Sequence, residues 1–436
     1  MKSYTLQLAI VIMLIGSTQS WIWGQKVTIV ESEAGYKSLS AVSSAPDTVS
    51  DSVEFRSQKY AARYTWERAI SLPLEILFLP VELFFKGTKK TIEFVDDSKL
   101  IPRLKYLLTC DDGSCGVIPT YSSISGGGIN VYQKGWFVPD AKFNLSLSLG
   151  LERTQQYQLR FRNNKLFNKA ISSDYLIRYR LLSEDYFFLN KEFNFAHEQT
   201  TAEVTYGKKI GDRNDLSVIF GFNVNNILEG RGKESPPISE CTCKEDLSGL
   251  GENVKLIRLE LAAHHDSKNR PGNPSGGIEA QAATGFYSQV GDDKFGFWKS
   301  SFDVKHFINL YYDRILMLRI AGEITEPVSS KEIPFYYLSE LGRTGTIRGF
   351  ERGRFRDRDM ILGTLEYRYP VWIRGIDALF FIDAGKVSPN IFNDNSGNEF
   401  NVSYGTGFRI WSKEGLVSKL EIGWSDDGMR ITFGLN

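Results

Sequence analysis

From about residue 120 to the C-terminus, apolar and polar residues alternate with a period of two. In residues 143–152, Phe and Leu alternate with Asn, Ser, Gly and Glu, and in residues 257–263 Ile, Leu and Ala alternate mainly with Arg and Glu. Because successive side chains of a β-strand point to opposite faces, such runs predict strands with one apolar and one polar face. Further runs lie at 157–162, 175–181, 298–308, 400–410, 416–424 and 429–435.

The two faces of these predicted strands differ in chemistry. The apolar face is rich in aromatic residues, whereas the polar face repeatedly carries Arg and Glu. This pattern is typical of a transmembrane β-barrel, whose outer face contacts lipid and whose inner face lines the lumen. About fifteen segments predict an even-numbered antiparallel barrel of about 14 or 16 strands. Residues 184–200 are the least regular and leave room for one hidden strand, and residues 229–251 are expected to form an extracellular loop.

The N-terminal residues have a different pattern. Lys2 precedes an apolar run from Leu6 to Ile15, and small or polar residues follow at 16–20. A basic start, a short apolar core and a small-residue exit predict a secretory signal peptide over residues 1–24. The apolar run is too short to act as a membrane-spanning helix.

Residues 25–119 are expected to form a partly helical segment on the periplasmic side or at the membrane interface, before a barrel over residues 120–436. Pro73 and Pro80 each begin an apolar stretch, and Pro is tolerated at the first position of a helix. Two short helices are therefore predicted within 64–94, and a third at 100–108. These helices are expected either to pack against the barrel mouth or the membrane interface, or to form a small soluble subdomain.

Composition and charge narrow the protein class. Aromatic residues make up 13% of the chain, with 39 Gly and 5 Met, a composition typical of β proteins. Lys and Arg number 52 and Asp and Glu number 52, so no basic surplus is available for nucleic-acid binding. A mean hydropathy of −0.24 argues against a helical membrane bundle, but it is compatible with a barrel whose strands alternate.

The four cysteines form two close pairs. Cys110 and Cys115 predict a small loop disulfide in an oxidising compartment. The single residue between Cys241 and Cys243 disfavours an easy bridge between them, which leaves pairing elsewhere as the alternative. The spacing does not favour zinc, and no metal or cofactor is expected.

A group of motifs lies near the C-terminus. A long connection over 327–358 contains Ile347-Arg348-Gly349-Phe350. Glu366 and Arg368 lie two residues apart on the next predicted strand, so they share one face. Asp383 is expected to be the only charge in its apolar strand, where a carboxylate needs a cationic partner. Arg348 is the natural partner if the connection folds into the lumen.

These motifs resemble the BamA/TamA family, the bacterial surface antigen barrels of outer-membrane assembly and translocation. In that family a loop tip of the pattern [VI]-R-G-[FY] lies in the lumen and contacts the wall on the next strands. The resemblance implies a 16-stranded barrel and a lock between the loop and the lumen. The matching residues are Ile347, Arg348, Gly349 and Phe350 in the tip, Glu366, Arg368 and Pro370 in the next strand, and Phe381, Asp383 and Gly385 in the one after.

An upstream segment is also similar to a family hairpin motif of the form D-x-R-x-N…P-x-x-G. Its strand spacing fits as well, with three predicted strands between this hairpin and the loop and five after the loop. The matching residues are Asp266, Arg270, Asn273, Pro274 and Gly277.

The chain departs from the family in two places. Residues 26–119 lack the β-α-α-β-β pattern of the POTRA repeats, which recruit substrates and partners in classical members. The last residue is Asn436 rather than an aromatic residue, although Phe433 lies close by in the lipid-facing register.

The resemblance implies a protein of the bacterial outer membrane that inserts or translocates proteins or lipids there, or that has a role descended from this one. Its expected partners are outer-membrane lipid or lipopolysaccharide and unfolded outer-membrane protein clients, with no nucleic acid. A passive porin-like channel is the alternative, with luminal arginines biasing it toward anions unless luminal Glu balances them. No enzyme is expected, because the four His do not accompany a G-x-S-x-G nucleophile motif.

Overall fold

The computed structural model describes residues 108–435, with several short gaps. The predicted signal peptide and the helices predicted within 64–108 lie outside the described residues, apart from Leu108. The gaps are 111, 123–125, 137, 140, 151–153, 164, 166–170, 190, 231–234, 271–272, 311–312, 343–344, 372–375, 394–399 and 412–415.

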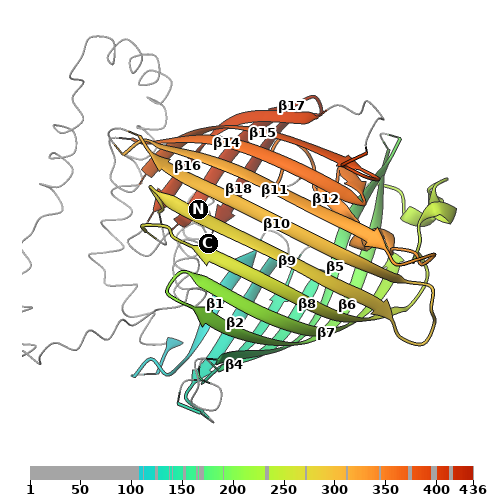
Figure 1. Ribbon diagram of the computed structural model, residues 1–436, viewed down its shortest axis with the longest axis horizontal. Coiled ribbons are helices and arrows are strands. Elements are labelled where there is room, and N and C mark those ends of the chain that lie inside the picture. The colour runs from blue at the N-terminus through green and yellow to red at the C-terminus, as the bar shows by residue number, and fades with distance from the viewer. Residues whose placement is uncertain are drawn as a thin grey trace, which may run out of the picture.

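Sixteen antiparallel strands form one continuous sheet that curls into a barrel (Figure 1). The all-β prediction and the 16-strand count are confirmed. In sheet order the strands are β1 (Cys115–Ser122), β2 (Gly126–Lys134), β3 (Ala141–Leu149), β4 (Gln155–Asn163), β5 (Ile171–Phe188), β6 (Lys191–Ile210), β7 (Asn214–Glu229), β8 (Val254–Asp266), β9 (Gly277–Gln289), β10 (Gly296–Asn309), β11 (Ile315–Pro327), β14 (Asp359–Pro370), β15 (Ile376–Ser388), β16 (Asn401–Trp411), β17 (Leu416–Ser425) and β18 (Gly428–Leu435).

The alternation along each strand places apolar side chains on the outside of the barrel. On β5, Tyr175 and Ile177 are exposed on the outer face, whereas Asp174 and Arg178 alternate with them on the inner face. A large apolar outer surface beside a charged interior is stable only where lipid surrounds the barrel. Within the described ranges, no helix has the length and hydrophobicity needed to cross a membrane.

The irregular region at 184–200 is the end of a long β-hairpin formed by β5 and β6. β5 has 18 residues and β6 has 20, and they pair from Ile171↔Lys208 to Phe188↔Lys191. The polar alternation is lost there because this end of the hairpin packs against loops on its inner face. Phe193 and Phe195 on β6 are buried in that packing.

Two long connections cover the same end of the barrel. The β7–β8 connection carries two short 3-10 helices, η3 (Ile238–Glu240) and η4 (Lys244–Asp246). The β11–β14 connection, called the long loop below, carries η5 (Phe335–Tyr337), β12 (Ser339–Leu341) and β13 (Phe355–Asp357). One apolar cluster joins both connections to the β5–β6 hairpin, through Phe193, Phe195, Ile238, Leu247 and Phe335.

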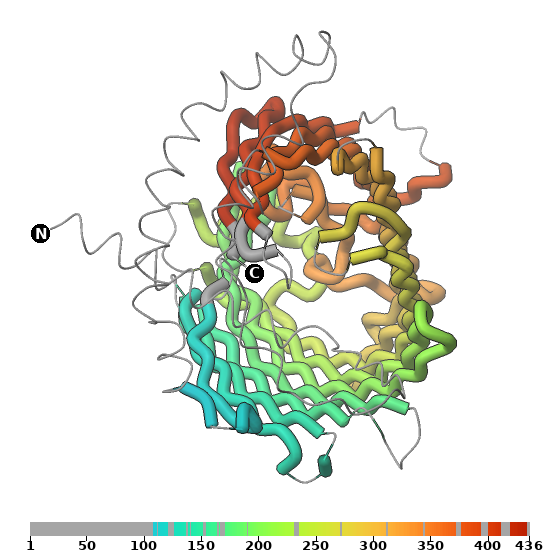
Figure 2. Tube along the Cα trace, turned by 90° about the vertical axis from the view of Figure 1, so that its left-hand side faces the viewer, coloured from blue at the N-terminus to red at the C-terminus, as the bar shows by residue number. Residues whose placement is uncertain are grey.

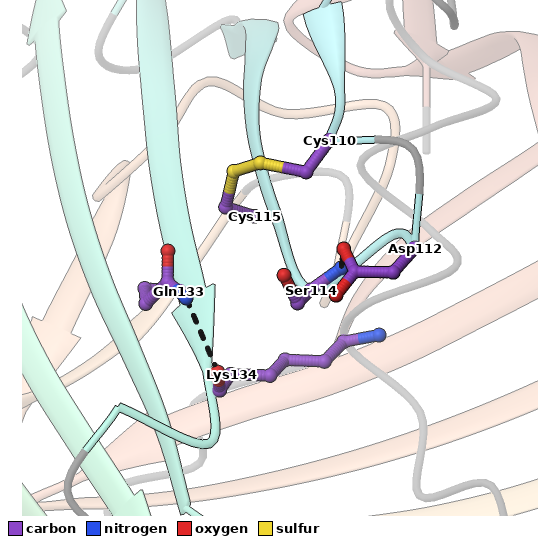
Figure 3. Close-up of a disulfide and its surroundings, with 6 residues drawn as sticks. All are labelled: Cys110, Asp112, Ser114, Cys115, Gln133 and Lys134. Carbon is purple, nitrogen blue, oxygen red and sulfur yellow. Dashed lines mark hydrogen bonds between the residues drawn. A yellow bond between two sulfur atoms is a disulfide. The ribbon is translucent and has the colours of Figure 1, made fainter.

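The two ends of the sheet meet on one side of the ring, where β1 and β18 lie (Figure 2). Among the described residues, these two strands form no hydrogen-bonded ladder, unlike every other neighbouring pair in the sheet. The first strand of the sheet, β1, begins at Cys115. The chain before β1 turns at Cys110 and Cys115, beside Asp112 and Ser114 (Figure 3).

Both close cysteine pairs are disulfides. Cys110 and Cys115 have Cα atoms 5.2 Å apart, and Cys241 and Cys243 have Cα atoms 5.1 Å apart. The suggestion that Cys241 and Cys243 pair elsewhere is therefore wrong, because the backbone turns at Thr242 and Cys243 and brings the two Cα atoms within disulfide range. The second bridge is buried in the apolar cluster that joins the loops.

Alkylation of the denatured protein tests both bridges. Without reduction we expect none of the four cysteines to react with iodoacetamide, and after reduction all four, as read by peptide mass spectrometry. The reduced sample is the control for reagent access. Alkylation of Cys241 or Cys243 in the unreduced sample would contradict the pairing.

Two substitutions on β10 test which face meets lipid. Val304→Arg places a charge on the outer face and should reduce unfolding free energy by about 2–4 kcal/mol if it lies near the bilayer centre. Ser301→Arg places the same charge in the lumen opposite Glu323 and should change it little. Urea unfolding in liposomes measures both, and equal losses for the two variants would refute the assignment of faces.

Candidate functional site

The tip of the long loop, residues 345–350, lies inside the barrel against its wall (Figure 2, orange). Ile347 is fully buried and Phe350 nearly so, in a cluster with Leu341 of β12 and with Met360 and Leu362 of β14. The β12–β13 ladder joins the two halves of the loop beside this cluster. Apolar burial and strand pairing therefore fix the tip before its charges are considered.

Arg348 is the centre of a buried ion cluster. Its Nε and Nη2 each donate to a different carboxylate oxygen of Asp383 at 2.9 Å, and its backbone N–H donates to Asp383 at 3.1 Å. Its Nη1 donates to Glu366 at 2.9 Å and to Glu421 at 3.2 Å. The guanidinium also lies 3.5 Å from the centre of the Phe381 ring. One side chain of the loop thus touches β14, β15 and β17.

The carboxylates around Arg348 are buried and need more than one cation. Asp383, Glu366 and Glu421 are at most 1% exposed. Arg409 of β16 supplies a second guanidinium, with Nη2 at 2.8 Å from Glu366 and 3.0 Å from Glu421. Charges buried this deeply persist only when each is paired and hydrogen-bonded, so the cluster is a connected unit.

The guanidinium of Arg348 stays protonated. Burial lowers the pKa of its guanidinium, but hydrogen bonds and charge from Asp383, with charge from Glu366 and Glu421, raise it by more. The pKa therefore lies above the ordinary value for arginine. The loop tip keeps its positive charge at every pH at which a protein folds.

Glycines in the motif allow the loop backbone to approach the wall. A Cβ atom on Gly349 would lie 2.7 Å from the side chain of Ser403 and 2.9 Å from that of Ser425. A Cβ atom on Gly423 of β17 would lie 3.0 Å from the backbone of Arg348. Ser425 donates to the carbonyl oxygen of Gly349 at 2.8 Å. Gly349 is thus required by contact distance, as Gly385 is beside Ile347.

The predicted β8–β9 hairpin docks on Arg368, the second arginine of the motif. Arg368 is 1% exposed, and its Nη1 donates to Asn273 at 3.1 Å while its Nη2 donates to the Pro274 carbonyl at 3.0 Å. Asn273 in turn donates to Asp377 of β15 at 3.3 Å. Because Arg368 lies 3.6 Å from Glu366, the hairpin is joined to the Arg348 cluster through neighbouring residues.

The other hairpin residues serve the turn. Asp266 caps it by accepting the backbone N–H of Lys268 at 3.0 Å, and Arg270 is exposed. Gly277 has φ 103°, a conformation that favours glycine, and a Cβ there would lie 2.3 Å from the Ser267 carbonyl oxygen. These residues shape the hairpin rather than join the ion cluster.

One group of side chains has metal-ligand chemistry. His264, Asp266 and Glu279 place one ligand atom each within 4.8 Å of the others. The ammonium of Lys268, however, lies 2.6 Å from Glu279 and 3.4 Å from Asp266. A lysine already neutralises this group, so it does not support a metal site.

Two members of the ion cluster could not be identified from the sequence pattern. Glu421 and Arg409 occupy polar positions of ordinary alternating strands, and no local pattern distinguishes them from other luminal charges. Asp383 is also not the only charge of its strand, since β15 includes Asp377 and Lys386. A search for luminal carboxylates on every strand near the chain end would have found Glu421.

The comparisons place the chain among known barrels. Residues 140–425 match the family model of the Omp85 superfamily domain. The structure is similar to BamA from Haemophilus ducreyi lacking POTRA domains 1-3, with 16% identity, a TM-score of 0.59, and coverage of 73% of this chain and 69% of that one. A weaker likeness is to CdiB from Acinetobacter baumannii, with 12% identity, a TM-score of 0.45, and coverage of 73% and 56%. No curated protein matches the sequence.

Replacing Arg348 tests the cluster. Arg348→Ala leaves three buried carboxylates with one guanidinium fewer and should reduce unfolding free energy by about 3–5 kcal/mol. Arg348→Lys keeps the charge but loses the two-pronged contact with Asp383, so an intermediate loss is expected. The measurement is the temperature at which the folded barrel loses its fast migration in SDS gels.

Arg352→Ala is the matched control. It removes an arginine from the same loop, but that side chain is 35% exposed and has a single contact to Glu184 at 3.3 Å. We expect a smaller shift than for Arg348→Ala. Unchanged heat resistance of Arg348→Ala would rule out a structural role for the cluster.

Proposed function

The chain belongs to the Omp85 superfamily, as a β-barrel of the outer membrane, and we propose that it inserts or translocates other outer-membrane proteins. The supporting observation is the loop tip held in the lumen one strand away from the end of the sheet. Arg348 and Gly349 contact Glu421 and Ser425 of β17, and β17 pairs directly with β18.

The seam between β1 and β18 supplies the chemistry for insertion. Strands without a partner present a row of backbone donors and acceptors that can template an incoming strand. In the described residues, the seam is the one place in the sixteen-stranded sheet where neighbours lack a ladder. Opening there would expose the edge toward lipid, where an unfolded barrel protein could add its strands.

The loop tip would hold the wall still while the seam opens. It contacts β14, β15 and β17 through Arg348, and β16 through the packing of Gly349 against Ser403. These contacts tie four of the last five strands to one body. Movement is then concentrated at the seam, and outer-membrane lipid or lipopolysaccharide meets the opening from outside.

The packed loops favour this role over a passive channel. The apolar cluster of the β7–β8 connection, the long loop and the β5–β6 hairpin covers one end of the barrel. The loop tip also occupies part of the lumen beside β14–β17. A porin that conducts solutes steadily needs an open path, which these segments narrow.

Depletion in the cells that make this protein tests the proposal. We expect the amounts of other outer-membrane barrels to fall, measured by quantitative proteomics of purified outer membranes. Re-expression of the wild-type chain should restore them, and re-expression of Arg352→Ala is the control for a folded variant of the same loop. Unchanged barrel amounts together with altered solute uptake would refute the proposal in favour of a channel.

A further inference from the structure

The inner face of β5 carries two neighbouring arginines that have no carboxylate partner among the described residues. Arg178 and Arg180 lie two residues apart on one strand, so their side chains project into the lumen about 7 Å apart. The Nε atom of each is buried and makes no hydrogen bond. Two guanidiniums so close together repel each other, and partial removal from water raises that cost.

The carboxylates nearest to this pair are already engaged by other cations. Asp174 accepts from both Arg160 and Arg162. Glu203 lies 2.5 Å from Arg258. Glu260 of β8 lies 3.5 Å from the same Arg258. Across these six residues, three positive charges face three negative ones, so these acids leave no surplus charge to balance Arg178.

The same holds on the other side of the pair. Glu184 lies four residues after Arg180 on the same face of β5. Its carboxylate is 3.3 Å from Arg352 of the long loop. The long loop therefore brings its own cation to this acid instead of leaving it for Arg180.

Neutral polar side chains surround the two arginines across the strands. Arg178 is paired in register with Gln158 of β4 and Thr201 of β6. Arg180 is paired with Gln156 and Gln199. The Thr201 hydroxyl already donates to Asn223 at 3.0 Å. Amides do not neutralise a cation, but those of the glutamines can donate hydrogen bonds to an anion that does.

We propose that Arg178 and Arg180 bind a phosphate-class oxyanion in the lumen. A tetrahedral oxyanion between two guanidiniums accepts charge-assisted hydrogen bonds from both, and it removes their mutual repulsion. Chloride would cancel charge, but as a single spherical ion it would not match the several N–H donors that two planar guanidiniums present. The site lies on β5, on other strands than the Arg348 cluster, and it does not depend on the proposed insertion activity.

Titration of the full-length protein in nanodiscs of phosphatidylcholine tests the site, with inorganic phosphate as the probe at constant ionic strength. Isothermal calorimetry should show binding by the wild type. The double variant Arg178→Gln/Arg180→Gln should bind roughly tenfold or more weakly, since each lost contact is charge-assisted. Phosphate binding that is absent in the wild type or equal in this variant would overturn the proposal.

Two further variants separate geometry from charge. Arg178→Lys/Arg180→Lys keeps the luminal charge and should still lose most of the affinity, and full affinity would overturn recognition by guanidiniums. Glu279→Gln/Lys305→Gln removes a luminal ion pair (3.3 Å) on β9 and β10 without changing net charge, and it should bind as the wild type does. If the double glutamine variant fails to fold, Arg178→Gln alone gives the same comparison.

The lipid in the nanodiscs distinguishes the source of the phosphate group. A soluble anion as the natural ligand predicts the same apparent affinity in phosphatidylglycerol and phosphatidylcholine discs. A lipid headgroup predicts weaker apparent binding of inorganic phosphate in phosphatidylglycerol discs, through competition that the double glutamine variant does not show. Both results support the site and assign its occupant.

Discussion

The buried charge of Arg348 is the interaction on which the rest of the lumen depends. Asp383, Glu366 and Glu421 are almost completely removed from water, and three carboxylates cannot remain ionised there without cations. Arg409, Lys419 and Arg368 supply cations from the wall for Glu366 and Glu421. The cation beside Asp383 is Arg348, on a loop that leaves the barrel at β11 and returns inside. The charges on the wall thus add to the apolar burial and strand pairing that hold the loop, and the close approach of Gly349 brings the charge of Arg348 within reach of them.

This constraint divides the barrel into parts of different stiffness. The strands from β14 to β17 are joined through the loop tip as well as through their ladders, and Arg368 extends the connection to the β8–β9 hairpin. Among the described residues, β18 and β1 each form a hydrogen-bonded ladder with one neighbouring strand only. Because opening free energies follow the number of contacts that must break, the seam is the part of the wall that separates at least cost. A rigid wall beside a weak seam is the mechanical arrangement that strand insertion needs.

The sequence predicted the features that follow from local periodicity and missed those that depend on closure of the sheet. Period two revealed the strands because lipid and water lie on opposite faces. The pairing of Arg348 with Asp383 could be inferred because Asp383 lies between apolar neighbours on a strand that follows a distinctive loop motif. Local pattern marks Glu421 only as one luminal carboxylate among several, since it becomes a neighbour of Arg348 only when β17 closes toward the loop. The long β5–β6 hairpin was obscured for a similar reason, because contacts with distant loops replace polar alternation there.

The formal net charge of +0 conceals two opposite situations inside the barrel. Near β14–β17, Arg368, Arg409 and Lys419 of the wall lie within 3.6 Å of Glu366 or Glu421. Asp383 is met instead by Arg348, which the chain folds inward. Along β5, Arg178 and Arg180 have no such acid among the described residues, because Asp174, Glu203 and Glu184 are engaged elsewhere. The same rule, that closely spaced charges with few water contacts need counter-charges, applies to both walls. At β14–β17 the counter-charge is Arg348, which belongs to the chain itself. At β5 the counter-charge must come from outside the described residues.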